Sequence, residues 1–235
     1  PVVVSMGSVA ASGGYYIAAA SDKIYATSGT ITGSIGVIAP MFDARETLGK
    51  LGIRENSIVS GEHKGSGDPF SEQSPAERAL MQDMVYDMYR QFFQVVLAAR
   101  HESIAQAAKS GEINRVINPS RTKITSQSVE WAAFTTGTVA SALKVPVEAE
   151  TALRHLADGR VYTGEQALRV GLVDEIGTLQ DAIDFAGRAA GLGDDPKTVE
   201  RTPGSEQTSW LASSISRVIQ QISTPRRSVE FRAPY

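Results

Sequence analysis

Cysteine is absent from this sequence, and histidine occurs only three times in 235 residues. The lack of cysteine excludes disulfide bonds, thiolate catalysis and cysteine-ligated zinc, but it fits a reducing or an oxidising compartment equally well. No cluster of metal-ligating residues and no phosphate-binding glycine loop occurs either. We therefore predict no metal and no cofactor.

Dense runs of lysine and arginine are also missing, and the net charge of −3 gives no reason to expect a nucleic-acid partner. No apolar run approaches the roughly 18–20 residues that span a bilayer, and no signal peptide is visible. The chain opens on a strand-like run, Pro1-Val2-Val3-Val4, without an initiating methionine. We expect that an amino-terminal part, including any membrane anchor, is missing.

The composition that remains is that of a globular protein, with 42% hydrophobic and 21% charged residues. Strand-like and helix-like stretches alternate along most of the chain, which predicts a layered α/β fold. We assign residues 1–192 to one domain, with a weakly patterned insertion at about 104–148. A polar tail, 193–235, follows, and one amphipathic helix is predicted there from the spacing of its apolar residues (Trp210, Leu211, Ile215, Val218, Ile219 and Ile222).

The local patterns predict individual elements. Strands are expected at 1–4, 21–27, 53–59 and 171–177, strand and loop at 31–39, and a turn into a short strand at 158–164. Helices are expected at 42–51, 149–156, 165–170 and 179–190. A long helix is expected to begin after Ser74, because Pro75 and Glu77 complete the signature of a capping box, and to end near Val95 and Val96. The glycine-rich stretch 60–69 between these elements is expected to be a loop.

The stretch Gly7 to Tyr16 lies between the β-branched run 1–4 and the small-residue run 17–20, and the whole reads as strand, turn and alanine-rich helix, with Ser12 where the turn meets the helix. Ser12 has two interpretations. It could be an ordinary N-cap serine, which is the commoner case. It could instead be a nucleophile, since free N–H groups and the positive end of the helix dipole would stabilise an oxyanion beside it.

A serine nucleophile needs a base. No histidine lies between Ser12 and His63, which disfavours a Ser–His–Asp triad, and His101 and His155 are expected at the surface. Lys64 lies in the glycine-rich loop and could serve as a base if it were desolvated, although a loop lysine is usually solvated. Ser34, in a Thr-Gly-Ser-Ile-Gly segment, is most simply a turn hydroxyl.

Four motifs nevertheless occur in a characteristic order: Ser12-Gly13-Gly14-Tyr15-Tyr16, Thr32 to Val37, Ser60 to Lys64, and Asp158 to Gly164. In this order they resemble the signal peptide peptidase A (SppA) family, serine peptidase family S49. Ser12 and Lys64 are 52 positions apart, as in the short single-repeat members. The resemblance covers about residues 1–103 and 149–191.

The resemblance implies a ClpP/crotonase-like fold of repeated ββα units and a Ser–Lys endopeptidase that degrades cleaved signal peptides. Ser12 would be the nucleophile, Lys64 the general base, Ser34 the residue that orients the lysine, and Gly13 the donor of one oxyanion N–H. A second oxyanion glycine of the family has no counterpart in this chain. The resemblance also implies a homo-oligomer at the cell membrane, anchored by the missing segment, with its catalytic domain outside the cytoplasm.

Three alternatives stay open. A phage-type capsid maturation peptidase of the same clan would use the same dyad on a scaffold protein. A crotonase relative would bind acyl-coenzyme A and need no Ser–Lys pair. A catalytically incomplete scaffold would retain only oligomer contacts, which the missing oxyanion segment favours.

Overall fold

A computed structural model describes residues 1–118 and 137–200. The chain divides into two units, Pro1–Pro196 and Lys197–Tyr235, and the description below concerns the first. The amphipathic helix predicted within 193–235 falls on residues outside the described ranges. Within those ranges, no helix combines the length and the apolar character needed to cross a membrane.

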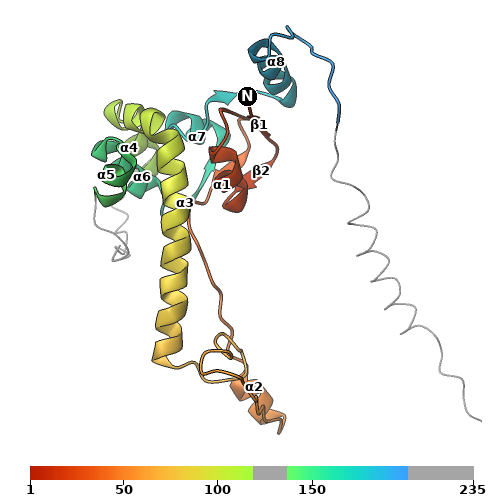
Figure 1. The fold of residues 1–235 in the computed structure, drawn as a ribbon, viewed down its shortest axis with the longest axis vertical. Coiled ribbons are helices and arrows are strands. Elements are labelled where there is room, and N and C mark those ends of the chain that lie inside the picture. The colour runs from red at the N-terminus through yellow and green to blue at the C-terminus, as the bar shows by residue number, and fades with distance from the viewer. Residues whose placement is uncertain (119–136, 201–235) are drawn as a thin grey trace, which may run out of the picture. The chain divides into compact units, whose positions relative to one another are not determined.

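The unit is mixed α/β, with two small sheets (Figure 1). The first sheet is parallel, and its strand order is β1 (Val3–Met6), β3 (Lys23–Ala26), β6 (Glu175–Ile176). In the second sheet the order is β2 (Val9–Ala11), β4 (Ile31–Gly33), β5 (Val161–Thr163). Strands β2 and β4 are parallel, whereas β5 runs antiparallel to β4.

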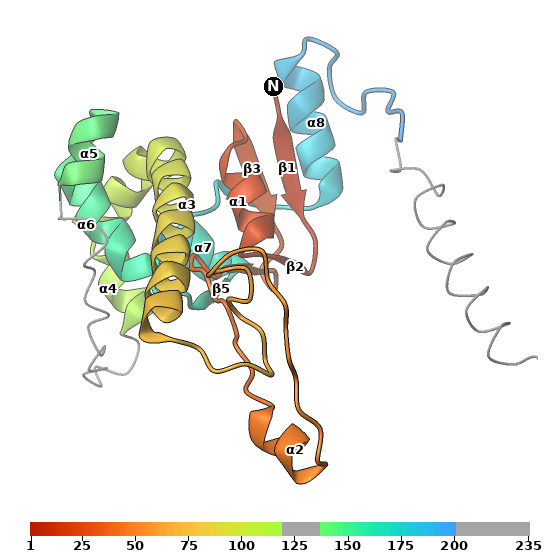
Figure 2. The same ribbon diagram turned by 60° about the horizontal axis from the view of Figure 1, so that its bottom comes forward.

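Each sheet contains one pair of parallel, hydrogen-bonded strands from the first part of the chain. Strand β1 pairs with β3 from Val3 opposite Lys23, and β2 pairs with β4 from Val9 opposite Ile31. In chain order, β1 and β2 lead into α1 (Gly13–Ala19), which packs against β2 and the long helix α3 (Pro75–Lys109) (Figure 2). Strands β3 and β4 lead through α2 (Arg45–Lys50) to α3. The strands β1 and β2 of the first strand–strand–helix segment thus pair in parallel with the strands β3 and β4 of the second, one pair in each sheet.

The core forms between the sheets and a group of helices that pack on the second half of α3. These are α4 (Glu112–Ile117), α5 (Thr138–Leu143) and α6 (Val147–Leu156). Helix α7 (Gly164–Arg169) packs against α4 and the strands β4, β5 and β6. Helix α8 (Leu179–Ala189) packs against β1 and β3. The largest fully buried side chains come from α1, β3, α3, α6 and the segments after β4 and α7: Tyr15, Phe93, Ile24, Ile35, Leu97, Ile104, Leu153, Leu156 and Leu172.

Helix α3 begins where the sequence predicts. Ser74 Oγ accepts a hydrogen bond from the Glu77 N–H at 3.2 Å, and Glu77 Oε2 accepts one from the Ser74 N–H at 2.8 Å. The predicted capping box is therefore confirmed. The predicted end near Val95 and Val96 is wrong, because Leu97, Ile104 and Ala107 are also buried and extend the helix to Lys109.

The capping box yields a first prediction. We expect Ser74→Ala to destabilise the first turn of α3 by about 1 kcal/mol, because one N–H loses its acceptor. Hydrogen exchange at the first-turn amides should then become about fivefold faster. Ser71→Ala, in the preceding exposed loop, is the control. Equal exchange rates in the two variants would contradict the capping role.

The segment before α3 departs from expectation. The strand predicted at 53–59 is wrong, since these residues form no strand and all are exposed, Ile58 by 98%. A strand needs a neighbouring strand and a surface that covers its apolar side chains, and this segment has neither here. The helix predicted at 42–51 is present as the shorter α2, and residues 60–69 form turns, as predicted.

The later elements follow the predictions more closely. The helices predicted at 149–156, 165–170 and 179–190 are confirmed as α6, α7 and α8, and the strand at 158–164 as β5. The strand predicted at 171–177 shortens to β6. Residues 104–118 and 137–148 are largely helical, with Ile104, Ile113 and Val139 buried in the common core. That 104–148 is an insertion relative to the family stays a prediction.

Candidate active site

Ser12 joins β2 to α1 in a backbone conformation that an ordinary N-cap does not have. Its φ is 52° and its ψ is −119°, and its side chain makes no capping hydrogen bond. By contrast Ser74, Thr163 and Thr178 cap α3, α7 and α8 with extended backbones and complete capping boxes. Although Ser12 occupies the N-cap position, its hydroxyl is not used as a cap. The N-cap interpretation of this side chain is therefore wrong.

The Ser12 conformation is a strained one that its neighbours hold in place. A positive φ at a residue other than glycine costs about 1–3 kcal/mol and persists only where the surroundings impose it. The Ser12 N–H donates to the Gly33 carbonyl at 2.8 Å, and the Ser12 carbonyl accepts from the Tyr16 N–H at 2.9 Å. These two bonds fix the turn between β2 and α1, and Ser12 itself remains exposed.

A cavity of about 680 Å³ lies beside this turn. Its walls come from the start of α1, the residues after β4, the middle of α3 and the loop before β5. The lining residues are Ser12, Gly13, Tyr16, Ser34, Gly36, Val37, Ile38, Met88, Gln91, Phe92, Asp158 and Gly159. The structure thus brings together three of the residues singled out in the sequence, Ser12, Gly13 and Ser34.

One wall of the cavity is apolar, and its position could not be predicted from the sequence. Phe92 is buried and meets the Tyr16 ring edge to face, with centroids 5.2 Å apart. Met88, one turn earlier on α3, is half exposed and completes the wall. The four-residue spacing of Met88 and Phe92 places both on one face of a helix, but which element that face covers depends on tertiary packing.

Gly13 has the features of an oxyanion donor. It is the first residue of α1, so its N–H is among the groups that lack an acceptor within the helix. It is exposed to the cavity, and nothing lies within 4 Å of where a Cβ would be. A negatively charged oxygen in the cavity could approach this N–H without steric obstruction.

Ser34 also lies in a turn with an unusual backbone, formed by Gly33 and Ser34. Gly33 has φ 77° and Ser34 has φ 51°. A Cβ on Gly33 would lie 2.6 Å from the Tyr162 ring, so this position requires glycine. The Ser34 N–H donates to the Arg160 carbonyl at 2.8 Å, which ties the turn to the loop that carries Asp158 and Gly159.

Lys64 does not line this cavity. It is exposed in a turn, where its N–H donates to the Gly61 carbonyl at 3.1 Å. Its ammonium group makes no hydrogen bond or ion pair with any residue in 1–118 or 137–200. The neighbouring His63 is likewise exposed and outside the cavity, so this arrangement of the described residues places neither Lys64 nor His63 beside the serine.

Comparison with known proteins identifies the family to which this chain belongs. The sequence model of peptidase family S49 matches residues 1–116 and 111–193. Because this match covers most of the chain, the protein belongs to peptidase family S49, and the family resemblance predicted from the four motifs is confirmed.

Several relatives carry protease names. A Synechocystis sp. protein named as a protease, slr0021, is 34% identical over 199 residues, which are 85% of this chain and 54% of that protein. An Enterococcus faecium protein named as a signal peptide peptidase, SppA, is 33% identical over 184 residues, 78% of this chain and 40% of its own length. Protease 4 of Haemophilus influenzae is 28% identical over 186 residues, 79% and 23% of the two chains. The chain therefore spans about half the length of the first two relatives.

Proposed function

We propose that this protein is a serine endopeptidase in which Ser12 is the nucleophile and Lys64 the general base. The observation that carries the proposal is the strained Ser12 turn, which exposes an uncapped hydroxyl beside the Gly13 N–H in a cavity. A serine on a sharp strand-to-helix turn recurs in hydrolases because it presents the hydroxyl to substrate. We also propose that the paired strand–strand–helix segments belong to a ClpP/crotonase-like fold.

The proposed reaction proceeds through an acyl-enzyme. Neutral Lys64 Nζ takes the proton of Ser12 Oγ while Oγ bonds to the substrate carbonyl carbon, and the Gly13 N–H stabilises the resulting oxyanion. The lysine ammonium then gives its proton to the leaving amine nitrogen as the peptide C–N bond breaks. Water next attacks the ester, Lys64 takes a proton from that water, and the Ser12 hydroxyl is restored with release of the carboxylic acid.

Apolar peptides fit the proposed site best. The wall of Tyr16, Met88 and Phe92 would receive an apolar side chain, while an extended peptide could add as a strand beside Ser12. Remnants of cleaved signal peptides have long apolar segments and are the proposed substrates. We propose that the protein acts at the cell membrane, with its catalytic domain outside the cytoplasm and a membrane anchor on a segment that precedes this chain.

The position of Lys64 bears on how the dyad forms. Lys64 must approach Ser12 either by rearrangement of its own loop or from a neighbouring copy of the chain. We propose that the protein is a homo-oligomer, a state supported by the exposed apolar side chains of Phe42 and Ile58 in the segment that carries Lys64. Mixing Ser12→Ala with Lys64→Ala protein separates the two routes, because activity returns only if the dyad forms between copies.

The role of Lys64 gives the second prediction. Lys64→Ala should lower kcat for a fluorogenic apolar peptide by about 10²–10⁴-fold, because the serine loses its base. The thermal unfolding midpoint should not change, since the exposed side chain makes no hydrogen bond or ion pair among residues 1–118 and 137–200. Lys50→Ala, an exposed lysine in α2, is the matched control and should retain full activity. Full activity in Lys64→Ala would exclude the proposed base.

Labelling of Ser12 tests the class of function directly. Intact-mass analysis after treatment with a serine-directed phosphonate should show one adduct, which Ser12→Ala should abolish. Such an adduct would separate a peptidase from an acyl-coenzyme A enzyme, which needs no activated serine. If no adduct forms even at millimolar reagent, the chain acts as a scaffold or lacks a necessary part of the site.

A further inference from the structure

Tyr15 lies three residues after Ser12, in the first turn of α1, and its side chain is completely buried. Its hydroxyl donates a hydrogen bond to the Leu172 carbonyl at 2.8 Å, across 157 positions of sequence. Burial raises the pKa of this phenol far above its ordinary value, so the hydroxyl stays a protonated donor at every working pH. The bond therefore connects α1, the helix that follows Ser12, to a distant segment at every working pH.

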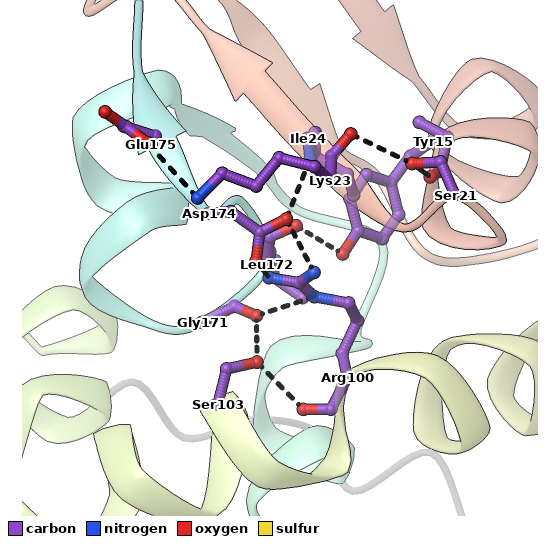
Figure 3. Close-up of polar contacts among 11 residues, drawn as sticks. Tyr15, Ser21, Lys23, Ile24, Arg100, Ser103, Gly171, Leu172, Asp174 and Glu175 are labelled. Atoms are coloured by element: carbon purple, nitrogen blue, oxygen red, sulfur yellow. Dashed lines mark hydrogen bonds and ion pairs between the residues drawn. The ribbon is translucent and has the colours of Figure 1, made fainter. Parts of the chain in front are cut away.

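The segment that accepts this bond, Gly171 to Asp174, is itself rigidly held, as Figure 3 shows. Arg100 of α3 donates to both Asp174 carboxylate oxygens, at 3.0 and 2.8 Å, and to the Gly171 carbonyl at 3.1 Å. The Ser103 hydroxyl donates to the same Gly171 carbonyl at 2.8 Å. On its other side, the Asp174 carboxylate accepts from the Ile24 N–H of β3 at 2.7 Å. Leu172 is thus fixed to both α3 and the first sheet.

Helix α1 packs against the core through Tyr15, Ala18 and Ala19, but few of its side chains can fix its orientation by hydrogen bonds. Its seven residues are Gly-Gly-Tyr-Tyr-Ile-Ala-Ala, so only Tyr15 and Tyr16 carry polar side chains. Of these two, the Tyr15 hydroxyl makes the hydrogen bond to a residue outside the helix, whereas Tyr16 contacts α3 through its ring. The two glycines at the start leave the backbone near Ser12 intrinsically flexible.

The strained Ser12 conformation requires restraint on both sides. The Gly33 carbonyl holds the Ser12 N–H on the strand side. On the helix side, the restraint must come through the first turn of α1, in which the Tyr16 N–H binds the Ser12 carbonyl. Within that turn, Tyr15 is the residue whose side chain makes a hydrogen bond to the core.

We propose that Tyr15 is a positioning residue for catalysis: its hydrogen bond to Leu172 holds the first turn of α1 so that Ser12 keeps its strained conformation and the Gly13 N–H stays beside it. This inference rests on the proposed peptidase function. It assigns the Arg100–Asp174 pair a part in the site as well, because that pair fixes the carbonyl that Tyr15 binds.

The test compares two tyrosine-to-phenylalanine variants. Tyr15→Phe removes only the hydroxyl. Tyr89→Phe is the matched control, because Tyr89 is also buried and its hydroxyl donates to the Ala157 carbonyl at 2.8 Å, so the bond holds neither α1 nor segment 171–174. Both should lower the thermal unfolding midpoint similarly. Only Tyr15→Phe should slow phosphonate labelling of Ser12 and lower kcat, by roughly 10–100-fold, with KM little changed.

The same pair of variants supplies a readout that needs no activity. Hydrogen exchange at the amides of residues 13–16 should accelerate in Tyr15→Phe and not in Tyr89→Phe. If the unmodified protein is never labelled at Ser12, the proposed function fails, while the exchange data still test whether Tyr15 holds the turn. Wild-type labelling and exchange rates in Tyr15→Phe would overturn the positioning role.

Discussion

Replacing Ser12 by alanine is expected to abolish peptide hydrolysis, with kcat falling by a factor on the order of 10⁴–10⁶, the size of loss seen when an activated serine is removed from a hydrolase. The protein should remain folded, because the hydroxyl caps no helix and makes no hydrogen bond among the described residues. Hydrolysis of a fluorogenic apolar peptide measures the first effect and thermal unfolding the second. Retained activity would exclude Ser12 as the nucleophile.

Replacing Ser12 by glycine tests the strain of its backbone separately from the loss of its hydroxyl. Its φ and ψ of 52° and −119° match the first central position of a type II′ turn, where glycine is preferred. Ser12→Gly should therefore be inactive, yet more stable than Ser12→Ala by about 1 kcal/mol, because glycine adopts this conformation without strain. If Ser12→Gly were the less stable variant, the turn would not be strained.

Removing the arginine of the Arg100–Asp174 pair should have the largest effect on stability. Arg100→Met is expected to lower the free energy of unfolding by about 3–5 kcal/mol, because it leaves a largely buried carboxylate without its charged partner. The Gly171 carbonyl also loses its bond to the Arg100 side chain. Urea unfolding monitored by circular dichroism measures the change.

An exposed ion pair provides the control for that experiment. Arg45 binds the Asp43 carboxylate through two nitrogens, and Asp43 lies at the surface. Hydrogen bonds from Arg45 lower the pKa of Asp43 to about 2, yet solvent screens the pair, so Arg45→Met should unfold like the wild type. If Arg100→Met and Arg45→Met were equally stable, the network around Asp174 would not hold segment 171–174.

Local sequence determines the features that depend on near neighbours. The capping box of Ser74 and Glu77 is formed by residues three positions apart, so its chemistry can be read from the chain. The glycines of the 60–69 loop are local in the same sense. The family resemblance rests on four short motifs, and it placed Ser12, Gly13 and Ser34, which the fold then brings to one cavity.

Tertiary structure decides the features that depend on distant partners. The pattern of residues 53–59 suits a strand, but no neighbouring strand receives it, whereas α3 continues past Val96 because α6 and the core cover Ile104 and Ala107. The conformation of Ser12 is likewise imposed from outside, by the Gly33 carbonyl and the first turn of α1. The sequence by itself determined which residues could carry the chemistry. Which of them meet depends on long-range packing and hydrogen bonds, because a strained turn and an apolar cavity wall exist only where distant segments enforce them.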